Sequence, residues 1–305
     1  MSRGVTMAPP PQQQHRLAVV ARALESPRTS TAAPMAAAKS SSGSSSGAAA
    51  AARMLLSRWL DRRWITEIED FPAVGGIDEA YAIHAAMAED SLVAELGGVV
   101  GYKMGGVGQV DGVAAAYGPL FGRGIVNAPA GLSHADYNLF NLEAEFGFLM
   151  ARDLDPRDEP FGENEVWAHV AEVVLCLELC GKRHSIAEPP SNLIGLADCS
   201  SAGGVVCGAR FPAASLDPST LSTVPTQILI NGESVASGTG GASPFGSPLA
   251  SLTWCANHLS MRGRKLAAGE LVIGGSTCKS QAFRSGDTVA VTFGELGRLE
   301  TTIMP

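Results

Sequence analysis

Three glutamates interrupt two apolar segments of the chain, and they constrain its fold more than any other feature. Glu143 and Glu145 lie in the run 141–150, and Glu178 lies in the run 173–180. Both runs have the length and the composition of strands with at least one buried face. A buried carboxylate costs several kcal/mol unless it is paired or binds a cation. The fold must therefore supply partners for these side chains.

The spacing of the glutamates indicates a shared site. Side chains alternate along a strand, so Glu143 and Glu145 point to the same face, about 6.6–7 Å apart along the chain. Glu178 shares its face with valine and cysteines, where exposure to solvent is less natural. Carboxylates from two strands form a hard oxygen-ligand set for a divalent ion such as Mg²⁺ or Mn²⁺. For Glu143 and Glu145 alone, the polar face of a half-exposed sheet explains the pattern equally well.

Residues 1–53 differ in composition from the rest of the chain. The run 39–52 consists almost entirely of Ser, Gly and Ala, which cannot bury enough apolar area to offset the entropy of ordering. The segment holds six of the 22 Lys and Arg residues but only one of the 30 acids, Glu25. This composition predicts a disordered transit peptide for a mitochondrion or plastid. The alternatives are a disordered tail on a cytoplasmic protein and a wrongly included upstream start codon.

The rest of the chain, 54–305, has the pattern of one β-rich domain. The sequence is 46% hydrophobic, which is ample for a sizeable core. Residues 54–97 have helical periodicity, whereas 98–305 consist mainly of short β-type runs between Gly, Pro and Asn. A hairpin is predicted at 227–237 and a further helix at 248–261. Because there is no regular βαβ alternation, the pattern predicts an α+β domain built on a mixed sheet or β-roll.

Charge and cysteine usage exclude several classes of protein. Outside residues 1–53 the chain is strongly acidic, which argues against nucleic acid or an anionic membrane surface as a partner. No run of about 20 uncharged apolar residues occurs, so no transmembrane helix is expected. The six cysteines form no Cys-x-x-Cys pair and lie mostly in apolar segments, which predicts free thiols in a reducing compartment. Glycine-rich runs lack the spacing of a nucleotide-binding loop.

Lys103 is a further candidate for the site. It lies at the end of a predicted strand, before a glycine-rich loop. A lysine in such a place can face a cleft, where burial and neighbouring charge tune it as an acid or base, or where it pairs with a substrate anion. From spacing alone, an ordinary surface lysine is the simpler interpretation.

Seven segments follow one another in an order that resembles a known enzyme family. They are Gly-Tyr-Lys-Met-Gly (101–105), Tyr-Gly-Pro-Leu-Phe-Gly (117–122), Glu-Ala-Glu (143–145), Glu-Leu-Cys-Gly-Lys-Arg (178–183), Ala-Asp-Cys-Ser-Ser-Ala-Gly (197–203), Phe-Gly-Ser-Pro-Leu-Ala (245–250) and Leu-Ala-Ala-Gly-Glu-Leu-Val-Ile-Gly-Gly-Ser (266–276). The chain resembles the 2-keto-4-pentenoate hydratase and 4-oxalocrotonate decarboxylase group of the fumarylacetoacetate hydrolase superfamily. The resemblance extends from about residue 54 to the C-terminus.

The resemblance implies a fold, a cofactor and a class of substrate. The fold is the fumarylacetoacetate hydrolase-like mixed β-roll with an N-terminal helical segment, and 54–305 form a single catalytic domain. The family's metal carboxylates match Glu143, Glu145 and Glu178, and the cofactor is Mg²⁺ or Mn²⁺. Members bind a small 2-oxo acid, or its enol, through the carboxylate and the adjacent oxygen on the metal. Relatives are homo-oligomers.

The same motifs imply further site residues. Lys103 matches the family's catalytic lysine, which would transfer a proton or offset substrate charge. Ser201 matches a serine near the substrate, and Ser276, at the end of the last segment, is assigned to substrate binding. Arg183, five residues after Glu178, is a candidate to hold a distal substrate carboxylate, and a structural salt bridge fits its position equally.

The predicted activity is hydration of a 2-hydroxy-2,4-dienoate to a 4-hydroxy-2-oxo acid. The alternatives are decarboxylation of a 4-oxalocrotonate-like diacid, hydrolysis of an acylpyruvate, and a non-catalytic relative of the family. Hydrolysis is disfavoured because residues 111–118 lack the His-Glu pair of that branch. Two residues depart from the pattern: Ala116 stands where a polar group is expected, and Cys199 stands where Asn is common. Both departures fit a changed substrate or a weakened activity.

Overall fold

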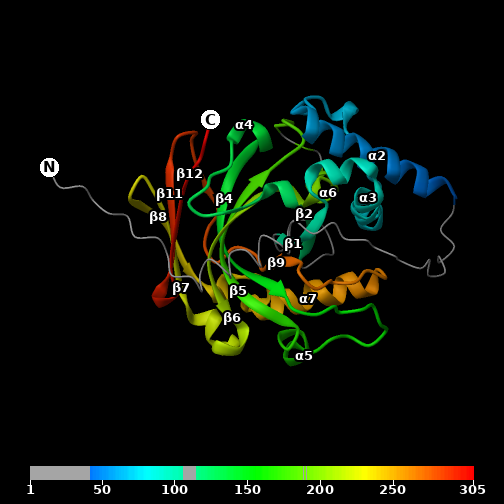
Figure 1. Cartoon of the computed structure of the whole chain (residues 1–305). Coiled ribbons are helices and arrows are strands. Elements are labelled where there is room, and N and C mark those ends of the chain that lie inside the picture. Colours follow the sequence, from blue (N-terminus) through cyan, green and yellow to red (C-terminus); the bar gives the residue numbers. More distant parts are fainter. Residues whose placement is uncertain (1–41, 106–114, 188, 190) are drawn as a thin grey trace. The chain divides into compact units, whose positions relative to one another are not determined.

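The computed structural model of the chain describes residues 42–105, 115–187, 189 and 191–305 (Figure 1). Residues 1–41, which make up most of the predicted transit peptide, lie outside the described residues. The described residues all belong to one structural unit. None of the helices in this part of the chain is both long and apolar enough to cross a membrane.

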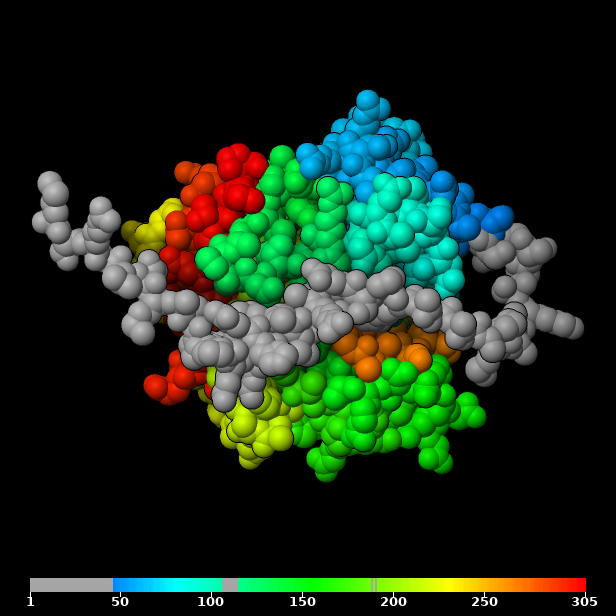
Figure 2. Space-filling view, viewed as in Figure 1, coloured from blue at the N-terminus to red at the C-terminus, as the bar shows by residue number. Residues whose placement is uncertain are grey.

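The first helix starts earlier than the sequence predicts. Helix α2 spans Ser42–Asp61, so the predicted boundary after residue 53 is too late. Alanine is the best helix former, and the side chains of Ala48, Ala51 and Ala52 are buried. These alanines share one helical face, so the low-complexity run gains packing that its composition does not reveal. In Figure 2, the residues of α2 and α3, in blue and cyan, adjoin on one face of the molecule.

The helix predicted up to the glycine pair at 97–98 is two elements, α3 (Ile77–Glu89) and η2 (Ser91–Leu96). Asp90 separates them, because its side chain accepts a hydrogen bond from Leu92 N at 2.8 Å and caps the second element. The predicted stop is confirmed, since Gly97 has a φ of 82°. His84 on α3 is buried, with Nε2 2.7 Å from the carbonyl of Leu196, so it packs inside the protein.

Two sheets form the core, and the mixed sheet that the sequence predicts is confirmed. The eight-stranded sheet has the order β2-β1-β9-β4-β5-β6-β3 with β10 beside β4, and the four-stranded sheet has the order β12-β11-β7-β8. In the large sheet β1 pairs with β9 and β3 with β6 in parallel, and the other pairs are antiparallel. The strands are β1 (Val99–Gly105), β2 (Ala116–Phe121), β3 (Ile125–Asn127), β4 (Leu139–Met150), β5 (Val170–Gly181), β6 (Ala202–Pro212), β7 (Pro225–Ile230), β8 (Glu233–Thr239), β9 (Leu271–Ile273), β10 (Gln281–Ala282), β11 (Thr288–Phe293) and β12 (Gly297–Thr302).

Three of the helices lie near the edge of the large sheet that is formed by β1 and β2. Figure 1 shows the four-stranded sheet beside β4, β5 and β6, whereas α2, α3 and α6 gather near β1 and β2. The hairpin β7–β8 is confirmed, and its turn has the two positive φ angles of a type I′ turn, 51° at Asn231 and 85° at Gly232. The helix predicted at 248–261 is also confirmed. The α-helices after α3 are α4 (His134–Tyr137), α5 (Glu163–Trp167), α6 (Asn192–Ala197) and α7 (Pro248–Met261).

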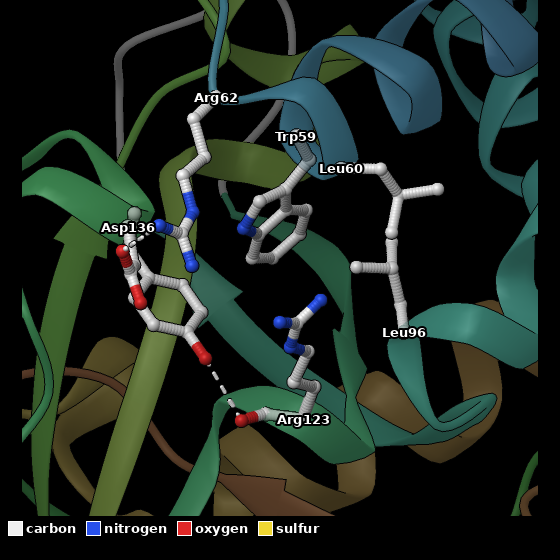
Figure 3. Close-up of a pocket in the computed structure, with 7 residues that line it drawn as sticks. Trp59, Leu60, Arg62, Leu96, Arg123 and Asp136 are labelled. Carbon is white, nitrogen blue, oxygen red and sulfur yellow. Dashed lines mark hydrogen bonds and ion pairs between the residues drawn. The ribbon is translucent and has the colours of Figure 1, made fainter.

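Trp59 anchors α2 to the large sheet. Its ring packs edge-on against Phe121 and Tyr137, with ring centroids 5.2 and 5.8 Å apart. Figure 3 shows Trp59 at a small hollow, next to the ion pair of Arg62 and Asp136, whose atoms are 3.1 Å apart. The hollow has a volume of about 20 Å³, so it holds no more than a water-sized molecule. It is a packing feature and not a candidate substrate site.

We expect Trp59→Ala to lower the free energy of unfolding by about 3–5 kcal/mol, because it removes a buried aromatic ring and leaves a cavity. The matched control is Arg62→Gln, which breaks a solvent-exposed ion pair and should cost at most about 1 kcal/mol. Urea unfolding followed by circular dichroism measures both. Equal losses in the two variants would show that the ring does not anchor the helix.

Candidate metal and substrate site

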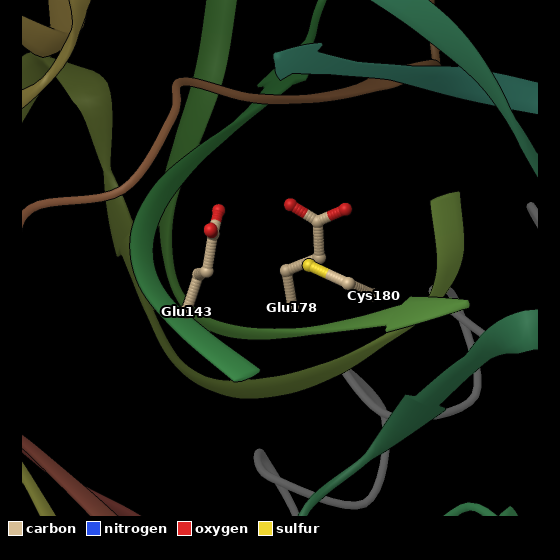
Figure 4. A group of neighbouring side chains, drawn as sticks. All are labelled: Glu143, Glu178 and Cys180. Atoms are coloured by element: carbon tan, nitrogen blue, oxygen red, sulfur yellow. The ribbon is translucent and has the colours of Figure 1, made fainter. Parts of the chain in front are cut away.

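The pairing of β4 with β5 brings two of the three predicted glutamates face to face. The antiparallel register places Glu143 directly opposite Glu178, and Glu145 opposite Cys176. The carboxylate oxygens of Glu143 and Glu178 and the sulfur of Cys180 all lie within 4.8 Å of one another (Figure 4). Glu178 is completely buried, and Glu143 is partly exposed. The strand alternation that the sequence indicates therefore concentrates negative charge inside the sheet.

Glu145 lies next to this pair and is held by the backbone. Its Oε2 accepts a hydrogen bond from the amide of Gly275 at 2.8 Å. Its Oε1 and the Oε2 of Glu178 are buried and find no hydrogen-bond partner among the described residues, whereas the Oε1 of Glu178 has an ion pair with Lys103. Such orphaned carboxylate oxygens are costly unless a cation binds them. The donor set therefore fits a hard divalent cation.

Burial also changes the protonation of the glutamates. It raises the pKa of Glu178 to about 7, although the ammonium of Lys103 acts in the opposite direction. Burial raises the pKa of Glu145 well above its usual range, and the charges of Glu178 and Glu143 add to this effect. Like charges held together in a dry environment favour the neutral form. A bound divalent cation favours the charged form and would lower these pKa values.

Cys180 is part of the cluster, although the sequence did not assign it to the site. Burial, followed by the charges of Glu178 and Glu143, raises the pKa of its thiol well above the usual value. A neutral thiol is a poor ligand for Mg²⁺ or Mn²⁺, which prefer oxygen. We therefore interpret Cys180 as a wall of the site and not as a ligand. Cys180 lies two residues after Glu178 on the same strand, and this spacing indicates that both side chains share one face.

Lys103 on β1 is buried and not a surface lysine. Its Nζ lies 3.2 Å from Oε1 of Glu178 and donates a hydrogen bond to the carbonyl of Ser200 at 3.0 Å. Burial lowers the pKa of an isolated lysine, but the Glu178 carboxylate holds the pKa of Lys103 above its usual value. The side chain is therefore an ammonium at neutral pH, and it lies against the carboxylate cluster.

A strained turn supplies the partner of Lys103. Cys199, Ser200 and Ser201 have consecutive positive φ angles of 56°, 51° and 62°, which non-glycine residues rarely adopt. The hydroxyl of Ser200 donates to the carbonyl of Tyr117 at 2.9 Å and holds the turn against β2. The Cys199 side chain is buried, with its sulfur 3.5 Å from that of Met87. The side chain of Cys199, which departs from the family pattern, therefore faces the core.

A cavity of about 420 Å³ adjoins the cluster. Three residues predicted for the site line it, namely Lys103, Glu143 and Ser201, and so does Ala116. Further polar residues of its wall were not predicted from the sequence, because they come from four segments that are distant in the sequence. They are Asn141, Lys182, His184, Ser191, Asn192, Ser200 and Ser280.

Arg183 and Ser276 do not line this cavity. The buried guanidinium of Arg183 binds the side chain and carbonyl of Asp198 and the carbonyl of Ala202. Adjacent residues on an extended chain face opposite ways, so Lys182 lines the cavity and Arg183 does not. The hydroxyl of Ser276 donates to the carbonyl of Cys278 at 2.7 Å. The structure therefore places both residues outside the wall of this cavity, and Arg183 forms the structural salt bridge that was the alternative.

Comparison with known proteins shows the family of this chain. Residues 112–304 match the family model described as "Fumarylacetoacetate (FAA) hydrolase C-terminal". The chain is 32% identical over 246 residues to a 2-keto-4-pentenoate hydratase of Paraburkholderia xenovorans, a match covering 76% of this chain and 86% of the relative. It is 25% identical over 242 residues to a 2-oxo-hept-4-ene-1,7-dioate hydratase of Escherichia coli, covering 75% of this chain and 87% of that one. The chain therefore belongs to the fumarylacetoacetate hydrolase family.

A solved structure shares the fold. It is 4-oxalocrotonate decarboxylase from Pseudomonas putida G7 in complex with magnesium and adipate, with a TM-score of 0.74 and 22% identity. The similarity covers 85% of this chain and 98% of that one. The fumarylacetoacetate hydrolase-like fold that the sequence motifs imply is thus confirmed.

We expect Mg²⁺ to stabilise the protein more at about pH 8 than at about pH 5.5. The raised pKa values of Glu178, about 7, and of Glu145 mean that the metal-free protein loses stability as the pH rises through them, because the buried carboxyls must then lose protons. Mg²⁺ binds the charged carboxylates, so its binding restores the stability that deprotonation removes. Thermal unfolding with excess MgCl₂ and with EDTA should show a metal-dependent rise in Tm that is at least about 3 °C larger at the higher pH.

The control for this experiment is the double variant Glu145→Gln/Glu178→Gln. It removes both titrating groups, so the difference between the two pH values should disappear. An equal or larger effect of Mg²⁺ at the lower pH in the unmodified protein would contradict the assignment.

Proposed function

We propose that this protein is a divalent-metal-dependent lyase that hydrates a 2-hydroxy-2,4-dienoate to a 4-hydroxy-2-oxo acid. The observation that carries the proposal is the carboxylate cluster, with orphaned buried oxygens, beside the Lys103 ammonium and a cavity. The names of the curated relatives, which are hydratases at 32% and 25% identity, support this activity.

Glu143, Glu145 and Glu178 would hold the Mg²⁺ or Mn²⁺ ion. When bound, the ion acts as a Lewis acid that orients a 2-oxo acid and polarises its carbonyl. The protein's own contribution is to keep three carboxylates together in a buried place, where charge interactions are strong. Glu145 is fixed by the Gly275 amide, so the cluster is organised before a substrate arrives.

The overall reaction needs two proton movements and one water molecule. The 2-hydroxyl group loses its proton and the terminal carbon of the diene gains one, which leaves a 2-oxo-3-enoate. Water then adds its hydroxyl to carbon 4 and a proton to carbon 3. Lys103 holds a proton at Nζ within the cavity wall, so it is placed to donate a proton or to offset the charge of the oxygen at carbon 2. Ser201 also lines the cavity and is placed to contact the substrate.

Decarboxylation of a 2-oxo diacid is the second candidate, and one observation favours it. Ala116 lines the cavity and has no polar group that would position the attacking water. Decarboxylation breaks a carbon–carbon bond and needs no attacking water at carbon 4. A 4-oxalocrotonate decarboxylase of Pseudomonas putida is 33% identical to this chain, but only over 102 residues. The two activities differ in their products, so the release of CO₂ separates them.

We expect Glu143→Gln and Glu178→Gln each to weaken Mg²⁺ or Mn²⁺ binding and to lower kcat/KM by more than about 100-fold, because each removes a charged ligand. Calorimetric metal titration and loss of dienol absorbance measure the two effects. The matched control is Glu172→Gln, because Glu172 lies on β5 with Glu178 but is partly exposed and pairs with Arg210, away from the cluster. Metal affinity that is unchanged in both site variants would refute the metal site.

The next variant separates Lys103 from the metal ligands. Lys103→Gln should lower kcat by about 10²–10⁴-fold, because a positioned proton donor is lost. It should leave metal affinity equal or higher, since it removes a positive charge from beside the carboxylates. Steady-state kinetics and metal titration measure the two quantities. A loss of metal binding with an unchanged kcat at saturating metal would show that Lys103 only organises the cluster.

A further inference from the structure

One face of β5 connects the carboxylate cluster to a second positive charge. Glu178, Cys180 and Lys182 alternate along this strand and its extension, so they project to the same side. Four residues of extended chain span about 13 Å, which separates the backbone of Lys182 from that of Glu178. Cys180 and Lys182 line the same cavity as Lys103 and Glu143. The cavity therefore has a cluster for a cation at one end and a lysine further along one wall.

The two lysines of the cavity differ in their partners. Lys103 is occupied by Glu178 and by the carbonyl of Ser200. Lys182 is half-buried, and its Nζ lies 4.3 Å from the centroid of the Phe140 ring. No carboxylate among the described residues lies within ion-pair distance of Lys182. Its ammonium thus lacks an anionic partner within the described part of the chain.

The neighbouring wall contributes further polar residues. His184 also lines the cavity, and burial lowers the pKa of its imidazole, which is therefore neutral. Its Nδ1 accepts from the amide of Ile186 at 3.3 Å, so the proton lies on Nε2. This Nε2 is buried and makes no hydrogen bond among the described residues, and it lies 3.9 Å from Oδ2 of Asp198. The amide of Asn192 lies in the same wall. Glu143, at the cluster, is the single carboxylate among the described residues that line the cavity.

We infer that the cavity takes a 2-oxo acid with a second, distal carboxylate, and that Lys182 is the residue that selects this class of substrate. The inference rests on the proposed function, because the 2-oxo end must lie at the carboxylate cluster for the other end to reach Lys182. A diacid gives the ammonium a charge-assisted partner. A monoacid of equal length brings an apolar end against the ammonium and leaves it unpaired. Lys182 thereby takes the role that the sequence had suggested for Arg183.

The packing of Lys182 on Phe140 is too weak to explain its position by itself. A cation–π contact at an exposed site contributes about 0.5–1 kcal/mol, and Phe140 is 37% exposed. If this contact were the whole role of Lys182, its replacement would not change the choice between ligands. Selectivity between a diacid and a monoacid is therefore the readout that separates the two roles.

The test compares two unreactive ligands of equal length, 2-oxoadipate and 2-oxohexanoate, which differ only in the terminal carboxylate. Their affinities for the full-length, Mg²⁺-loaded protein are measured by isothermal titration calorimetry. We expect the unmodified protein to bind 2-oxoadipate at least about tenfold more tightly. In Lys182→Gln this preference should fall to about one, through weaker binding of 2-oxoadipate alone. Lys182→Arg should retain most of it, and the control Lys265→Gln, an exposed lysine paired with Asp153, should retain all of it.

The outcomes separate this inference from the proposed function. Equal affinity for both ligands in the unmodified protein, or a preference that survives in Lys182→Gln, would overturn the role of Lys182 and leave the 2-oxo acid site intact. A failure of both ligands to bind in the presence of Mg²⁺ would overturn the proposed function and this inference with it. A preference that is lost equally in Lys265→Gln would reduce the effect to the general charge of the protein.

Discussion

The structure depends on one costly arrangement, a cluster of three carboxylates, two of them buried, at the pairing of β4 with β5. Glu143 stands opposite Glu178 in this pairing, and Glu145 lies one pleat away on the same face. Repulsion and desolvation both oppose such a cluster. The sheet nevertheless holds it, because the flanking residues of both strands are fully buried and fix the register. A one-residue slip would turn the whole apolar set to the other face.

Other elements compensate the same cluster from outside the two strands. Lys103 reaches it from β1, and Gly275 supplies an amide from the segment after β9. The turn at 199–201 adopts three strained φ angles, and its Ser200 carbonyl accepts a hydrogen bond from Lys103. Strain of this kind persists only where the surrounding structure enforces it, and it is concentrated at functional sites. The same contacts thus offset the charge of the carboxylates and organise the site for a reaction.

Local patterns predicted what depends on the alternation of side chains. The placement of Glu143 and Glu145 on one face, the turn at Asn231 and the helix at 248–261 all follow from residues close in sequence. The start of α2 did not, since a run of Ser, Gly and Ala becomes a stable helix only when its alanines find a surface to pack on. Likewise, Arg183 had two interpretations of equal weight, and its partner Asp198 lies 15 residues away.

The sequence by itself determined the mixed α+β class, the family and the presence of a carboxylate site, because these depend on composition, order of motifs and strand period. Only the tertiary structure decided that Lys103 is buried against Glu178, that Cys180 belongs to the cluster and that Lys182 lines the cavity where Arg183 does not. The physical reason is that charge interactions and burial depend on distances between segments far apart in the chain. Those distances are set by the packing of the whole sheet and not by any local pattern.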